Sequence, residues 1–184
     1  MGADHGLDAQ LEASRARRRH ELEAEQAAGI FDDGPGAADK IGARENVEII
    51  LRGPDGEIKQ HEHVENLITT AGRNAIVERL DSSPSTAQPS HMAIGTGTNA
   101  PAAGDTTLQT EIDRNALTSN VAAANVLTMI ADWAAGDGTG AITEAGVLNA
   151  ASSGTLYSRA TFSVVNKGSS DTLQITWTYT LTVS

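Results

Sequence analysis

The chain has 184 residues and contains no cysteine, which excludes a disulfide framework and thiolate chemistry. Its formal net charge of −11 argues against a nucleic-acid-binding protein, because neutralising phosphates requires clustered lysine and arginine. No run approaches the ~20 apolar residues of a membrane span, and the first ten residues lack the pattern of a secretory signal. Aromatic residues make up only 3% of the chain, so we expect a modest core that oligomerisation would help to stabilise.

The first 42 residues differ in composition from the rest. Leu7 to Ala28 predicts a helix, because alanine, leucine, glutamate, glutamine and arginine dominate and proline is absent. Residues 29–42 contain Gly-Pro-Gly and predict a linker. We therefore expect residues 1–42 to form an N-terminal helical arm with its linker, either solvated or docked on a neighbouring subunit. Residues 43–184 would then form the folded domain.

A β-hairpin and a short helix are predicted at the start of this domain. Asn46 to Leu51 and Glu57 to Val64 alternate as strands do, and a Pro-Asp-Gly turn lies between them. Thr69 or Thr70 is the predicted N-cap of a helix over roughly Ala71 to Leu80.

Most of the remaining sequence predicts strands separated by glycine-rich and serine-rich turns. The expected strands are His91–Ile94, Val126–Trp133, Ile142–Asn149, Thr155–Asn166 and Thr172–Val183. Gly95 to Asp105 reads as a long loop, and Leu108 to Leu117 as either a helical turn or the beginning of a strand. The last strand is the clearest, because Leu173, Ile175, Trp177, Tyr179 and Leu181 recur with a period of two. The pattern predicts a mainly β fold, an antiparallel β-sandwich or jelly-roll-like domain with one short helix.

Two short motifs invite a binding interpretation. His61 and His63 share one side of a strand and could contact one metal ion, but neither His91 nor any cysteine supplies a further ligand at a recognised spacing. We therefore expect solvent-facing side chains and no metal site there. The segment Gly95-Thr-Gly-Thr-Asn99 lacks the Gly-Lys-Ser/Thr ending of a phosphate-binding loop, and it instead predicts close packing of the backbone.

Carboxylates and aromatic residues offer weaker candidates. Asp132, Asp137 and Gly138 could contact calcium, but their spacing matches no EF-hand loop. A sugar-stacking platform would draw on the four tryptophan and tyrosine side chains, Trp133, Tyr157, Trp177 and Tyr179. With so few aromatic residues in the chain, we expect these four to lie in the core.

Two further groups could be read as acid–base pairs, namely Glu111 with Asp113, and Glu144 near Arg159. Catalytic carboxylates require a cleft and an orienting second group, and the sequence indicates neither. Exposed or intersubunit ion pairs are the preferred interpretation. We therefore predict no catalytic, cofactor-binding or metal-binding residue, no cofactor, and no enzymatic activity.

Two blocks of the chain carry a longer pattern. The first, Asn66 to Glu111, contains NLITTAGR followed by IGTGT and GDTTLQTE; the second, Ile142 to Val183, contains ITEAGVLN, SGTLYSRATF and DTLQITWTYTL. Together these motifs resemble a family of small structural proteins of tailed phages and related viruses, over roughly residues 45 to 184. The resemblance implies a virion component and not an enzyme.

The resemblance implies assembly as the function. We expect a tail-associated protein of the collar or fibre-attachment type that contacts other virion proteins and forms a homo-oligomer, with a trimer favoured. One alternative is a capsid decoration protein on the head shell. A second is a module that binds host-surface carbohydrate through Trp133 and the loop from Asp132 to Ala141, which would require exposed aromatic side chains. The weakest is a glycan hydrolase, which needs two carboxylates in one groove.

Overall fold

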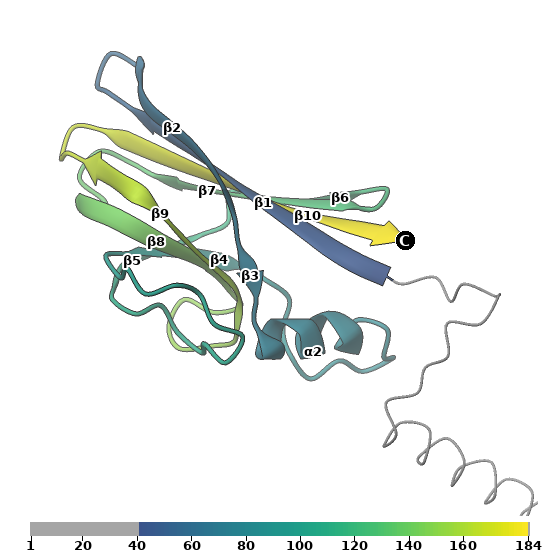
Figure 1. Ribbon diagram of the computed structural model, residues 1–184. Coiled ribbons are helices and arrows are strands. Elements are labelled where there is room, and N and C mark those ends of the chain that lie inside the picture. Colours follow the sequence, from purple (N-terminus) through teal and green to yellow (C-terminus); the bar gives the residue numbers. More distant parts are fainter. Residues whose placement is uncertain (1–40, 184) are drawn as a thin grey trace, which may run out of the picture. The chain divides into compact units, whose positions relative to one another are not determined.

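Two antiparallel β-sheets stack face to face, and the apolar core lies between them (Figure 1). The computed structural model describes residues 41–183. The predicted helix from Leu7 to Ala28 and nearly all of the linker therefore lie outside the described residues. Within those residues, the mainly β, sandwich-like fold predicted from the sequence is confirmed.

Each sheet has five strands. The first sheet has the order β2-β1-β10-β7-β6. Its strands are β1 (Ile41–Arg52), β2 (Ile58–Glu65), β6 (Ser119–Ala123), β7 (Val126–Trp133) and β10 (Thr172–Val183). The second sheet has the order β3-β9-β8-β4-β5. Its strands are β3 (Leu67–Ile68), β4 (His91–Gly95), β5 (Glu111–Ala116), β8 (Gly140–Leu148) and β9 (Leu156–Lys167). The helix is α2 (Thr70–Glu78).

In the centre of the first sheet, the apolar side chains that alternate along the strands form part of the core. β10 pairs with β1 along its whole length, so that Val47 lies opposite Trp177 and Ile49 opposite Ile175. All four side chains are buried and face the second sheet. The alternation predicted for β10 is confirmed, and its apolar face is buried up to Tyr179, whereas Leu181 on the same face is 49% exposed. Its partner on β1, Ala43, is exposed as well, so the second sheet does not cover this end of the first.

The short helix begins where the sequence predicted. The Thr69 hydroxyl accepts a hydrogen bond from the Gly72 amide (2.9 Å), which is the N-cap interaction. The same hydroxyl donates to the carbonyl oxygen of Leu156 on β9 (2.6 Å). The cap therefore also fixes the start of α2 against the second sheet.

Several elements differ from the prediction. Residues 108–117 contain a strand, β5, so the helical alternative for that segment is wrong. β3 and β6 were not predicted, because β3 has two residues and β6, with the sequence SNVAA, is poor in strand-forming side chains. Pairing with β9 and β7 positions these two strands. The predicted hairpin is confirmed, and Gly56 in its turn has a φ of 85°, which favours glycine.

Substitution of Gly72 tests how closely α2 approaches the second sheet. A Cβ atom at this position would lie 2.1 Å from the carbonyl oxygen of Tyr157. Gly72→Ala should therefore lower the free energy of unfolding by about 1–3 kcal/mol, whereas alanine normally stabilises a helix interior relative to glycine. Gly104→Ala is the matched control, because a Cβ atom at that position would extend into open space. Urea denaturation measures both, and a stabilised Gly72→Ala variant would contradict this account.

Candidate functional site

The outer face of the second sheet is covered by the long loop between β4 and β5. Leu108 from this loop packs into a small apolar cluster with Ala93, Leu148 and Leu156, all of which are buried. Gly146 in β8 lies directly beneath, and a Cβ atom there would lie 2.7 Å from the Leu108 side chain. The loop therefore packs on the sheet as closely as a core element does.

A buried carboxylate holds both ends of this loop. Glu144 on β8 is 0% exposed. Its Oε1 accepts hydrogen bonds from the backbone amides of Gly97 (2.9 Å) and Thr110 (2.7 Å). Its Oε2 accepts one from the amide of Gln109 (3.0 Å). One side chain thus bonds to the segment that leaves β4 and to the segment that enters β5.

Arg159 on the neighbouring strand β9 neutralises this carboxylate. Its Nε and Nη2 lie 2.9 and 2.8 Å from Oε2 of Glu144, and its Nη1 donates to Asp105 (3.0 Å) in the middle of the loop. Burial alone would raise the pKa of Glu144, but the three amides and the guanidinium outweigh that effect and hold the pKa below its ordinary value. We refer to Glu144, Arg159, Asp105 and the amides of Gly97, Gln109 and Thr110 as the Glu144 clasp.

The clasp corrects one prediction and confirms another. Glu144 and Arg159 were expected to form exposed or intersubunit ion pairs, but the loop covers them, and they are buried within one chain at 0% and 2% exposure. Close packing of the backbone at Gly95 and Gly97 is confirmed, because a Cβ atom at either would lie within about 2.6 Å of Oε1 of Glu144. Both carboxylate oxygens are occupied by intramolecular donors, so the arrangement holds a loop in place.

The other candidate acid–base pair was Glu111 with Asp113, but Glu111 contacts Arg114 instead. Glu111 forms a two-pronged interaction with Arg114, at 2.8 and 2.6 Å, in which the arginine side chain is 9% and the glutamate side chain 31% exposed. Glu111 therefore belongs to an ion pair, as expected, but the arginine side of that pair is largely buried.

A second buried polar group was missed by the sequence analysis. Glu45 on β1 faces inward beside Val47, accepts a hydrogen bond from the Ser158 hydroxyl (3.1 Å), and is 7% exposed. The same hydroxyl contacts the Tyr179 hydroxyl. Burial raises the pKa of Glu45 to about 8, although the Ser158 hydrogen bond acts in the opposite direction. The inward alternation of β1 is the sequence signal that could have located this side chain.

The loop from Asp132 to Ala141, considered for calcium or carbohydrate binding, has the arrangement of neither kind of site. Asp132 accepts hydrogen bonds from Thr118 (2.6 Å) and Gln174 (2.8 Å), and among the described residues it forms no ligand cluster with Asp137. A pocket of about 340 Å3 is lined by Asp132 together with Arg52, Asp137 and Gln174. Trp133 and Trp177 are both 0% exposed, which confirms their expected place in the core. The carbohydrate alternative therefore lacks the exposed aromatic platform that it requires.

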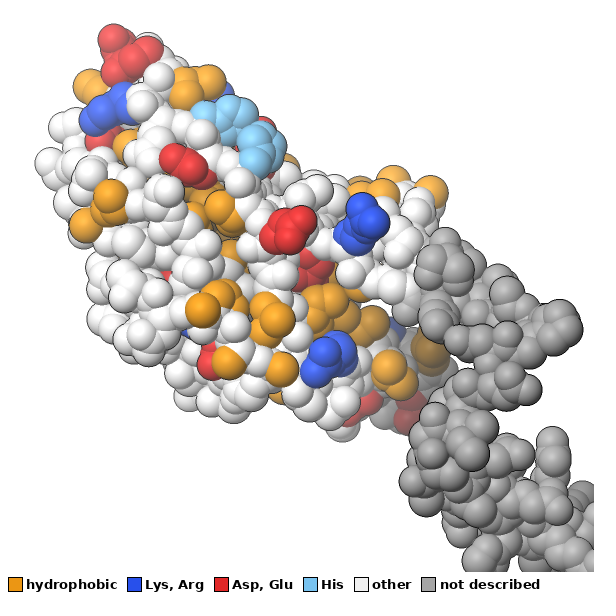
Figure 2. Space-filling model, in the orientation of Figure 1, with side chains coloured by type: hydrophobic (Ala, Val, Ile, Leu, Met, Phe, Trp, Pro, Cys, Tyr) orange, Lys and Arg blue, Asp and Glu red, His pale blue; other side chains and the backbone are white. Residues whose placement is uncertain are grey.

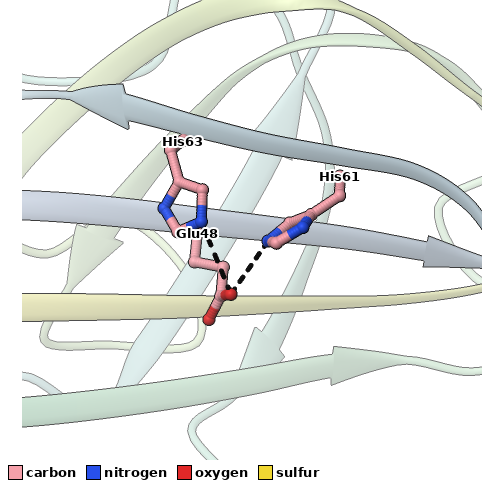
Figure 3. A group of neighbouring side chains, drawn as sticks. All are labelled: Glu48, His61 and His63. Carbon is pink, nitrogen blue, oxygen red and sulfur yellow. Dashed lines mark hydrogen bonds and ion pairs between the residues drawn. The ribbon is translucent and has the colours of Figure 1, made fainter.

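The two histidines of β2 lie on the outer face of the first sheet, as expected for solvent-facing residues. Their rings lie beside a carboxylate on the adjacent strand, Glu48 of β1 (Figure 3). Nε2 of His61 is 2.9 Å and Nε2 of His63 is 3.7 Å from Oε1 of Glu48. Within residues 41–183, these three form the one group of three or more potential metal-ligating side chains. Glu48 was not singled out in the sequence, although the predicted hairpin pairs its strand with that of the histidines.

Comparison with protein families, curated proteins and solved structures finds no match to this chain. In the part of the chain that the structure describes, no helix is long and apolar enough to cross a membrane.

Removing the charge of Glu144 tests the clasp. Glu144→Gln keeps the size of the side chain but leaves the buried Arg159 with Asp105 as its remaining carboxylate partner, so we expect the free energy of unfolding to fall by at most about 3–5 kcal/mol. Amide hydrogen exchange at Gly97, Gln109 and Thr110 should accelerate. Glu111→Gln removes a glutamate that is 31% exposed from an arginine pair, so it should cost less than Glu144→Gln, whose side chain is 0% exposed. Equal losses in the two variants would contradict a special role for Glu144.

The raised pKa of Glu45 predicts that the protein becomes less stable as the pH rises. Its pKa is about 8 in the folded chain and about 4.5 in the unfolded chain, so between these values the folded state binds a proton that the unfolded state has released. This contribution is fully present below about pH 4.5 and is lost as the pH rises to about 8. The loss should amount to about 5 kcal/mol at most. Glu45→Gln should remove it, as measured by urea denaturation from pH 4 to 9. Parallel curves for the two proteins would contradict the prediction.

Proposed function

We propose that this chain is a non-enzymatic structural protein of a tailed virus particle, of the tail-associated collar or fibre-attachment type. In this proposal it acts by assembly with other virion proteins and with further copies of itself, as a trimer. Its place of action is the virion.

The observation that carries the proposal is the place in the fold of the motifs that resemble that family. GTGT contributes Gly95 and Gly97, ITEAG contributes Glu144 and Gly146, and SRATF contributes Arg159. All five lie in or beside the Glu144 clasp. The most distinctive residues of the pattern therefore serve to fix a long loop on a sheet, which is what a rigid building block requires.

The surface supports an assembly function. β6 is an edge strand of the first sheet, and its sequence SNVAA has no charged side chain. Edge strands of monomeric proteins usually carry charges that prevent pairing with another chain. Large apolar side chains are also exposed at several places on the described domain, among them Leu80 (90%) and Val121 (58%, on β6). Figure 2 shows apolar atoms scattered over one face between polar ones.

The proposal is tested on virus particles themselves. Antibodies raised against the full chain are applied to particles purified by density gradient from cells that encode it, and the label is located by electron microscopy. Label at the tail supports the tail-associated assignment, and light scattering of the full chain in solution should give the mass of a trimer. Label over the head shell would replace that assignment with the capsid decoration alternative. If mass spectrometry detects no trace of the chain in purified particles, the proposal is overturned.

A further inference from the structure

We propose that Glu48, His61 and His63 form a binding site for one divalent transition-metal ion of the Zn2+ class. The inference rests on the geometry of these residues alone and is independent of the proposed function.

The strand pairing brings the three side chains to one place. His61 and His63 are two residues apart on β2, so both imidazoles extend to the same face of the sheet. β1 pairs with β2 in a register that puts Glu48 directly opposite His63. Figure 3 shows the carboxylate of Glu48 reaching from β1 toward both rings. Three ligands therefore converge from two strands joined by one tight turn.

The distances suit a small metal ion. One ring nitrogen of each histidine and one carboxylate oxygen of Glu48 all lie within 4.8 Å of one another. Nitrogen and oxygen ligands at about 2.0–2.1 Å from a tetrahedral zinc ion are about 3.3–3.4 Å apart. The observed separations from Oε1 of Glu48, 2.9 and 3.7 Å, lie on either side of that value. Small rotations of exposed side chains would bring all three to the ion without moving the backbone.

The ligand types define the class of metal. Two imidazole nitrogens and one carboxylate oxygen suit zinc, copper, nickel or ferrous iron, whereas calcium and magnesium require mostly oxygen ligands. The set supplies three ligands, and a fourth position would remain for water or for a donor from another molecule. That position would face solvent, because the Glu48, His61 and His63 side chains are 35%, 41% and 65% exposed. Figure 2 shows the histidine side chains gathered in one exposed patch.

Nearby cations do not compete for the carboxylate. Among the described residues, the ion-pair partners of Glu48 are His61 and His63 themselves. On the other side of β1, the residue paired with Glu48 is Thr176 of β10, which is uncharged. A bound ion would therefore gain a carboxylate without displacing lysine or arginine, and it would connect the edge strand β2 to β1.

Calorimetric titration of the full-length chain with ZnCl2 tests the site. The protein carries no affinity tag and is first treated with a chelator. We expect one ion per chain, with His61→Gln or His63→Gln each weakening binding about tenfold or more, and the double variant H61Q/H63Q losing this site. Free Zn2+ at 100 times Kd should also raise the melting temperature by about 5 °C or more. MgCl2 should give no comparable signal.

His91→Gln is the matched control. His91 lies on β4 in the second sheet and contacts Ser90, so this variant should bind zinc as the unchanged protein does. His5 and His20 are present in every variant, so any binding by them is the same background throughout. The exposed substitutions should leave the far-ultraviolet circular dichroism unchanged. Zinc binding of equal stoichiometry and affinity in the unchanged protein and H61Q/H63Q would overturn the proposal, as would the absence of any binding.

Discussion

The burial of one carboxylate constrains the whole second sheet. A charge removed from water costs several kcal/mol unless donors surround it, and Glu144 obtains them from three backbone amides and one guanidinium. Those amides belong to the loop, so the loop must lie on the sheet for Glu144 to be satisfied. The loop in turn accepts a hydrogen bond at the Ala103 carbonyl from Thr70, at the start of α2. Sheet, loop and helix are thereby fixed by one chain of contacts.

The parts of the fold that sequence reasoning predicted well are those with a local cause. β7 and β10 were predicted with their observed bounds because alternation over many residues is a strong signal. The N-cap was narrowed to Thr69 or Thr70, of which Thr69 is observed, because an N-cap depends on its immediate neighbours. β6 was missed because its position depends on pairing with β7 and not on its own side chains. The buried state of Glu144 could not be predicted, since the backbone amides that bond to it lie 34 to 47 residues away.

For Glu48 and Glu45, the sequence predicts part of the arrangement but not all of it. Both belong to β1, and alternation assigns Glu48 to the outer face and Glu45 to the inner face with Val47. Glu48 lies next to His63 because of the register of the hairpin, and the Pro-Asp-Gly turn predicts that hairpin. The burial of Glu45 against Ser158 could not be inferred in this way, because Ser158 belongs to the other sheet, 113 residues later. The face on which each side chain lies could therefore be predicted, but the partner of Glu45 across the two sheets could not.

The place of β10 between β1 and β7 has a consequence for biosynthesis. The middle strand of the first sheet is translated roughly 120 residues after β1, and chains grow at about 5–20 residues per second, so β1 and β2 wait several seconds for it. During that interval β1, whose apolar face includes Val47 and Ile49, has no strand partner on its second edge. Completion of this sheet is therefore a late event, and until then the nascent hairpin has an unpaired strand edge of the kind that is prone to aggregation.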